Sequence, residues 1–241
     1  MYIIEMVSNM KLIMFVLMVI LLVVISICIF KNGTLYKSKH TIDCAVSDGK
    51  YLYIATHGHL EKWTLGGKRQ ASVRLPVKHI VNGKVIGNLV VLVSNVPSNS
   101  LILVNKDSFQ IIDIIMIPEI TNPLVWVDYD QDKWWLCDYT GKLKESVIYC
   151  FSSEWNPLGV WTLPKEITHN NDGDIVDGIW TNHHLHVGIG SKMYILKLPA
   201  DKMEAKVLSV VNILLDCTNY SITKDGNVMC VQDTKVCACN L

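Results

Sequence analysis

Net charge is the first property that this sequence lacks. Its 22 lysine and arginine residues balance 22 aspartate and glutamate residues, so the formal charge at pH 7 is zero. A nucleic-acid-binding domain usually carries a concentrated basic surface, and an acidic tail usually serves a basic partner. The sequence has neither feature, and it therefore predicts no nucleic-acid partner.

Short catalytic and cofactor-binding motifs are absent as well. The chain contains no G-x-S-x-G, no P-loop, no G-x-G-x-x-G and no H-E-x-x-H. Its eight cysteines do not show the paired C-x-x-C spacing of a zinc site. We expect no cofactor, and an enzyme becomes the less favoured class of function, although an active site assembled from several loops would leave no such motif.

Charged residues are missing entirely from Leu12–Phe30. As a helix these 19 positions would extend about 28 Å, close to the thickness of a bilayer's hydrocarbon core. The segment is long and β-branched and ends without an A-x-A-like cleavage site. We therefore predict a retained transmembrane helix (a signal anchor) over residues 12–30, between an N-terminal lead-in (1–11) and a juxtamembrane segment (31–40).

The side of the membrane on which the large domain lies is a separate question. One lysine precedes the apolar segment closely and three follow it, which by the positive-inside rule favours a cytoplasmic domain. The many cysteines and two N-x-[ST] sequons, at Asn32 and Asn219, favour the extracytoplasmic side instead. We expect an extracytoplasmic domain glycosylated at Asn219, with a cytoplasmic domain as the alternative.

The remaining residues, 41–241, repeat one pattern five times: two apolar, strand-like runs joined by a tight polar turn. The first runs are Tyr51–Ala55, Leu89–Val93, Trp134–Cys137, His184–Gly188 and Val228–Val231. The second runs are Leu60–Leu65, Leu101–Val104, Val147–Phe151, Met193–Leu196 and Val236–Cys239. The repeats are 38 to 50 residues apart, which is typical of a β-propeller. The sequence therefore predicts an all-β, five-bladed propeller behind one transmembrane helix.

The fifth repeat ends before a fourth strand can form. Propeller rings commonly close by pairing strands from the two ends of the chain, because closure removes exposed sheet edges. We therefore predict that Gly33–Lys39 supplies the outer strand of the fifth blade. Of the outer strands, the one predicted at Gln110–Ile117 is the most apolar outside the membrane segment.

The repeats resemble the non-WD propeller repeats of the quinoprotein-like and YVTN-like kind, which occur in extracytoplasmic proteins. The resemblance rests on segments Asp48–Thr56, Leu60–Lys68 and Leu101–Ser108, and the G-H…W-D signature of WD40 repeats is absent. It extends over residues 41–241 and implies a fold, without assigning a role to any residue.

Three cysteine pairs are candidates for disulfides. Cys230 and Cys237 should face each other, because residues opposed across a hairpin turn at 232–235 have numbers that add to a constant. Cys137 and Cys150 lie on adjacent predicted strands. Cys44 lies on the innermost strand of the first blade, which ring closure brings next to the fifth. The last pair would therefore join Cys44 to Cys217, unless all these cysteines are small buried hydrophobes.

Histidines and tryptophans supply the other candidate sites. His184 and His186 share one face of a predicted strand, and Asp174 or Asp177 could complete a metal site with them. The alternative is a polar loop leading into a strand. Tryptophans could stack on a sugar or peptide or pack between blades, and the candidates for binding are Trp126, Trp155 and Trp161.

These observations leave three hypotheses for function. The first is a membrane-anchored, non-catalytic platform that binds a protein or glycan partner. The second is a metal-dependent hydrolase or lactonase, which should gather His and Asp/Glu from several blades at one end of the channel. The third is a structural subunit of a membrane or envelope complex. No catalytic residue is predicted.

Overall fold

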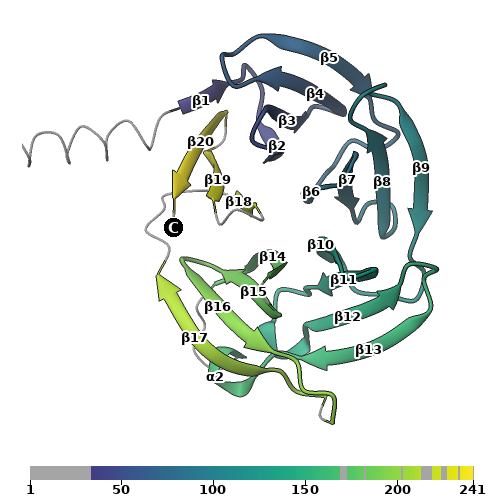
Figure 1. The fold of residues 1–241 in the computed structure, drawn as a ribbon, viewed down its shortest axis with the longest axis vertical. Coiled ribbons are helices and arrows are strands. Elements are labelled where there is room, and N and C mark those ends of the chain that lie inside the picture. Colours follow the sequence, from purple (N-terminus) through teal and green to yellow (C-terminus); the bar gives the residue numbers. More distant parts are fainter. Residues whose placement is uncertain are drawn as a thin grey trace, which may run out of the picture.

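The computed structural model describes residues 34–168, 173–181, 183–201, 203–212, 219–223, 227–232 and 234–240. Within them, five four-stranded antiparallel sheets surround a common axis (Figure 1). The innermost strands of the five sheets lie closest to the axis, and the outermost strands form the rim. The predicted five-bladed β-propeller is confirmed.

The first two blades follow the chain outward from the axis. Blade one consists of β2 (Ile42–Ser47), β3 (Tyr51–Thr56), β4 (His59–Thr64) and β5 (Arg69–Arg74). Blade two consists of β6 (Asn82–Ile86), β7 (Leu89–Ser94), β8 (Ser100–Asn105) and β9 (Ile111–Met116). The two inner hairpins have tight turns, because Gly49 and Gly87 adopt the positive φ that such turns require.

Blades three and four repeat this order and include short helical turns. Blade three consists of β10 (Leu124–Asp130), β11 (Lys133–Asp138), β12 (Val147–Ser152) and β13 (Pro157–Thr162), with η1 (Leu143–Glu145) before β12 and α2 (Lys165–Thr168) after β13. Blade four consists of β14 (Ile175–Thr181), β15 (His184–Ile189), β16 (Lys192–Lys197) and β17 (Lys206–Asn212).

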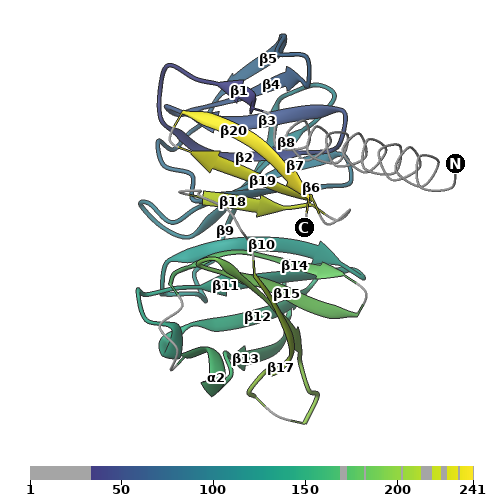
Figure 2. The ribbon, with the colours of Figure 1, turned by 90° about the vertical axis from the view of Figure 1, so that its left-hand side faces the viewer.

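Blade five combines the two ends of the domain. It consists of β18 (Asn219–Ile222), β19 (Asn227–Gln232), β20 (Lys235–Asn240) and β1 (Thr34–Lys37). β1 pairs antiparallel with β20, with Tyr36 opposite Val236 and Lys37 opposite Lys235 (Figure 2). The predicted closure of the ring by the segment after residue 33 is therefore confirmed.

Five hydrophobic clusters hold the blades together, one between each neighbouring pair. Alternation along each strand explains them, because successive side chains point toward opposite neighbours. In blade two, for example, Val90 and Leu92 face blade one, whereas Val91 and Val93 face blade three. The second strand of each blade is thus largely buried on both faces, which accounts for the first apolar run of each repeat in the sequence.

Close packing between blades three and four depends on a glycine. The indole of Trp126 on β10 lies against Gly178 on β14, so a Cβ at Gly178 would lie 2.4 Å from an indole carbon. We expect Gly178→Ala to destabilise the fold by about 1–3 kcal/mol, because the fully buried indole has no free space to move into. Chemical denaturation of the variant and the wild type measures the difference in the free energy of unfolding.

Gly66→Ala is the matched control for that substitution. A Cβ at the exposed Gly66 meets no atom closer than 3.8 Å, and its backbone is not in the left-handed region. Equal stabilities of the two variants would contradict the packing described for Trp126.

The predicted transmembrane segment, residues 12–30, lies outside the described part of the chain. Among the residues that are described, no helix combines the length and the apolar character needed to cross a bilayer.

Candidate functional site

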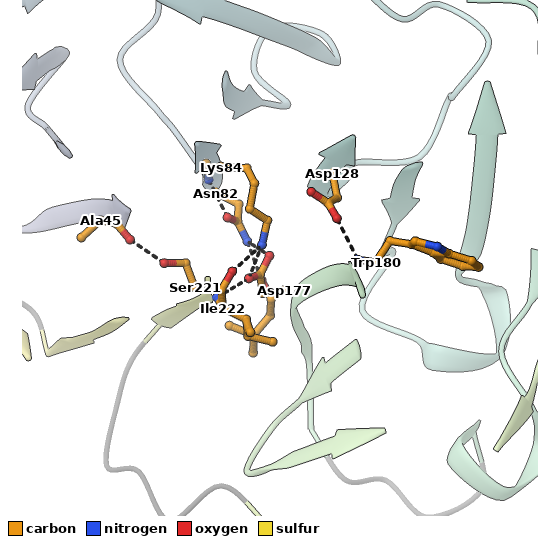
Figure 3. Close-up of polar contacts among 10 residues, drawn as sticks. Ala45, Asn82, Lys84, Asp128, Asp177, Trp180, Ser221 and Ile222 are labelled. Carbon is orange, nitrogen blue, oxygen red and sulfur yellow. Dashed lines mark hydrogen bonds and ion pairs between the residues drawn. The ribbon is translucent and has the colours of Figure 1, made fainter. Parts of the chain in front are cut away.

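A buried ion pair occupies the axis of the ring, where a propeller often has an open channel. The Nζ of Lys84 on β6 lies 2.9 Å from Oδ2 of Asp177 on β14, and both side chains are almost inaccessible to solvent (Figure 3). The same Nζ donates to the carbonyl oxygen of Ile222 on β18. One lysine therefore links the inner strands of blades two, four and five.

The partners of Asp177 satisfy its carboxylate from several sides. The backbone N–H of Ile222 donates to Oδ2 at 2.6 Å, and the amide of Asn82 donates to Oδ1 at 3.2 Å. Burial raises the pKa of Asp177 above its usual range, although the Lys84 ammonium and backbone N–H groups oppose this effect. A carboxylate held by this many donors suits a structural role better than proton transfer.

Further polar contacts extend this network around the axis. The Ser221 hydroxyl on β18 donates to the Ala45 carbonyl oxygen on β2 at 2.7 Å. The N–H of Trp180 on β14 donates to Oδ2 of the buried Asp128 on β10, also at 2.7 Å (Figure 3). Each blade thus contributes at least one group to contacts that cross between blades near the axis. We name Lys84, Asp177, Asn82 and Ser221 the axial network.

A small cavity of about 150 Å³ lies at the end of the axis where the inner hairpins turn. Its lining includes Lys84, Ser221 and Asp48. The Asp48 carboxylate accepts hydrogen bonds from the backbone N–H groups of Lys50 and Tyr51, the Tyr53 hydroxyl and Lys106 Nζ. The acidic group is thus engaged by donors from blades one and two.

These donors give Asp48 a measurable pH dependence. Burial alone would raise its pKa, but the N–H groups of Tyr51 and Lys50 and the other donors outweigh it and lower the pKa. A carboxyl with a lowered folded-state pKa stabilises the fold above its unfolded pKa of about 3.9, and this stability is lost as the pH falls through the folded value.

We expect Asp48→Asn to cost about 2 kcal/mol at pH 7 and to reduce the loss of stability below pH 4. Urea denaturation at several pH values measures both effects. Asp113→Asn is the matched control, because Asp113 is exposed and its Oδ1 accepts a hydrogen bond from the adjacent backbone N–H of Ile114. A variant whose acid profile matches that of the wild type would contradict this account of Asp48.

The opposite face of the ring has two larger cavities in equivalent positions. One, of about 330 Å³, lies between the loop before β8 and the loop before β10, and its lining includes Pro97, Met116 and Pro123. The other, of about 400 Å³, has Tyr139, Leu143 and Asp174 in its lining, and the Tyr139 hydroxyl donates a hydrogen bond to the Asp174 carboxylate. This contact and burial raise the pKa of Tyr139 to about 12, with burial the larger cause.

The four predicted metal ligands do not form a site. Asp177 is held in the axial network, and Asp174 accepts the Tyr139 hydroxyl. His184 and His186 lie on β15, the second strand of blade four, where burial and the neighbouring His184 lower the pKa of His186. Nowhere in the described ranges do three His, Cys, Asp or Glu side chains come close enough to share an ion. The predicted combination is therefore wrong. The strand alternation holds, but the register of β14 and β15 places Asp177 opposite Gly188, and Asp174 lies beside Gly190 at the other end of the strand pair from His184.

The three predicted disulfides are also wrong, since Cys44, Cys137, Cys150 and Cys237 carry free thiols. Cys230 and Cys237 do face each other as predicted, but Cys237 Sγ contacts the Thr34 hydroxyl at 3.8 Å. Cys137 pairs with Ile148, which places Cys150 two residues out of register.

The side chain of Cys44 faces blade two. Its Sγ lies beside Gly83 of blade two, and its side chain belongs to the cluster between blades one and two. Cys217 lies outside the described residues. The prediction of a Cys44–Cys217 disulfide was wrong because the position of a strand in the ring does not determine whether a given side chain faces the preceding or the following blade.

Thiol reactivity tests these assignments. Burial raises the pKa of Cys150 to about 11 and raises the pKa values of Cys44 and Cys137 still further, and all three side chains are buried. Because the thiolate is the reactive form, we expect iodoacetamide to alkylate the partly exposed Cys237 while these three react only after unfolding. Peptide mass spectrometry measures the pattern, and protection of Cys237 that is removed by a reductant would restore the disulfide hypothesis.

The three tryptophans predicted to bind a ligand have different environments. Trp126 is fully buried, so its predicted role at a surface is wrong. Trp161 is partly buried and donates its Nε1–H to the Pro199 carbonyl oxygen at 2.9 Å. Trp155 is half-buried and stacks on Trp134, with ring centroids 5.0 Å apart. Asn219 begins β18, and its glycosylation stays a prediction.

Lys84 and Asn82 were not among the site residues predicted from the sequence. Their one signal in the sequence was an amide and a charged residue in a short segment that apolar residues flank on both sides, at positions 80–81 and 85–86. A lysine at such a position needs a buried partner, but the partner lies 93 residues away. No local pattern identifies it.

Comparison with known proteins supports the fold. No known family matches the sequence, and no curated protein matches it. The structure is similar to the solved structure of U3-55K, with a TM-score of 0.51 and 9% identity over 88% of this chain and 98% of that one. It is also similar to a chain in the structure of the mitotic checkpoint complex, with a TM-score of 0.50 and 8% identity over 83% of this chain and 61% of that one. At these identities the likeness concerns the propeller fold alone, and the resemblance to quinoprotein-like repeats stays a prediction.

Proposed function

We propose that this propeller is a non-catalytic binding platform for a protein partner, held at a membrane by residues 12–30 with the propeller on the extracytoplasmic side. One observation carries the proposal. Of the eleven large apolar side chains exposed in the described ranges, eight lie on the outer strands of three consecutive blades. They are Ile112, Ile114 and Met116 of β9, Leu158 and Val160 of β13, and Leu208, Val210 and Val211 of β17. We name these eight residues the apolar rim.

The apolar rim is not a general consequence of the fold. β5, the outer strand of blade one, exposes Arg69, Gln70, Ser72 and Arg74 instead. Monomeric soluble proteins rarely leave large apolar areas exposed unless these areas bind something. The charged groups of the axial network, by contrast, are buried and already paired with each other and with backbone groups. Binding at the rim is therefore better supported than chemistry at the channel.

Cross-linking of the full chain in the cells that produce it tests this function. We expect the wild type to cross-link to a defined partner and the triple variant Ile112→Ser, Leu158→Ser, Leu208→Ser to lose it. The matched control carries Gln70→Ser and Arg74→Ser on β5. A rim variant that keeps the same partner, or a purified full chain that hydrolyses lactones, would contradict the proposal.

A further inference from the structure

The outer edge of β9 has little protection against pairing with another strand. It is the last strand of its sheet, and no other strand of the described chain pairs with it from outside (Figure 1). Natural edge strands are usually protected by lysine or arginine, by proline, or by a covering segment. β5 has two arginines and β13 begins with Pro157, whereas the six residues of β9 include a single charge, Asp113.

Asp113 covers one of the outward backbone groups of β9. The N–H of Ile117 donates to Asn99 on the β8 side, so by alternation the N–H groups of Ile114 and Met116 point outward. The Asp113 carboxylate accepts the Ile114 N–H at 2.8 Å. A cation beside Asp113 would draw the carboxylate away and free this N–H for a new partner.

β9 also leads into a cavity. This is the cavity of about 330 Å³ on the face of the ring opposite the small axial cavity. Its lining includes Met116, the following Ile117, and the prolines Pro97, Pro118 and Pro123. This volume is at the lower end of the range for ligand pockets, and it accommodates one bulky side chain. If another chain paired with β9, the residue of that chain opposite Met116 would lie at the mouth of this cavity.

We propose that β9 binds an extended segment of the partner protein as a fifth strand of blade two. The bound segment alternates apolar residues, which cover Ile112 and Ile114. It places a lysine or arginine opposite Asp113 and a bulky apolar side chain in the proline-lined cavity. Main-chain hydrogen bonds to an exposed sheet edge supply affinity in this mode, and side-chain positions supply specificity. The inference rests on the proposed platform function and specifies its binding surface.

Charge decides between this occupant and a second copy of the chain. When two β9 strands pair antiparallel about their centre, the two Asp113 side chains lie close together, and like charges that face each other destabilise a sheet. A basic residue in a different protein has the opposite effect. The edge therefore favours a heterologous, basic segment.

Selection of peptides from a random display library on the full chain tests the proposal. We expect enriched peptides with alternating apolar residues and one basic position, and slower hydrogen exchange of the Ile114 and Met116 amides when they bind. Ile114→Lys and Asp113→Lys should each weaken binding about tenfold or more, the loss that about 1.4 kcal/mol produces. Changing the basic residue of the peptide to glutamate should restore binding to Asp113→Lys. Ser72→Lys, at an exposed position of the outer strand β5 outside the apolar rim, is the matched control and should bind like the wild type.

The other outcomes would overturn the proposal in distinguishable ways. Enriched peptides that bind Ile114→Lys as well as the wild type would place the site elsewhere and leave the platform function intact. A library that yields no binder, together with no cross-linked partner, would contradict both. A dimer that Ile114→Lys abolishes would assign the edge to a second copy. Binding to phosphatidylcholine vesicles that Ile114→Lys abolishes would assign it to lipid.

Discussion

Lys84→Met is expected to destabilise the propeller by roughly 3–5 kcal/mol at pH 7, because it leaves the carboxylate of Asp177 buried without its cation. The Nζ of Lys84 also bonds to Ile222 of the closing blade, so the same change loosens the contact between blades two and five. Urea denaturation measures the effect. Lys68→Met is the matched control, because Lys68 is exposed in a hairpin and should change stability by no more than about 0.5 kcal/mol.

The pH dependence of the Lys84→Met variant gives a second, independent reading. Without Lys84, burial dominates and raises the pKa of Asp177 further. A carboxyl whose folded-state pKa lies above its unfolded value stabilises the fold when protonated, and this contribution disappears as the pH rises. The variant should therefore be less destabilised at pH 4 than at pH 7.

The double variant Lys84→Met, Asp177→Asn should be more stable than Lys84→Met alone. A neutral amide at position 177 needs no buried cation and can still accept the hydrogen bond from the Ile222 N–H. If the double variant loses as much as the two single variants combined, the two residues act independently and the ion pair does not link the blades.

Deletion of Thr34–Lys37 is expected to cost about 4 kcal/mol, equivalent to a fall of roughly 8–16 °C in Tm for a domain of this size. The deletion removes the ladder between β1 and β20 and the packing of Leu35 and Tyr36 on the cluster between blades one and five. Tyr36 also lies 4.8 Å, between ring centroids, from Trp63 of blade one. Thermal unfolding followed by circular dichroism measures the change.

The deletion should also expose the edge of β20 and promote self-association, because an unpaired edge strand templates pairing with another chain. Adding a peptide of residues 33–39 in trans should restore stability, whereas a scrambled peptide should not. Lys37→Ala, which changes only an exposed side chain of β1, is the substitution control. A deletion variant with the Tm of the wild type would show that another contact closes the ring.

The sequence by itself determined the blades, since each depends on contacts between residues close together in the chain. Turns such as Asp48-Gly49 fix the register of a hairpin, and alternation then decides which residues are buried. The same reasoning placed Cys230 opposite Cys237. The closing role of β1 followed as well, because a fifth blade with three strands leaves one edge to fill.

Only the tertiary structure decided what meets at the axis and which side each inner strand faces. Lys84 and Asp177 are far apart in the sequence, and their contact depends on how the five inner strands tilt around the axis. The same geometry turns Cys44 toward blade two, where its side chain joins the cluster between blades one and two. Local hydrogen bonds and turns contain no information on these orientations, because they arise from packing one sheet against the next.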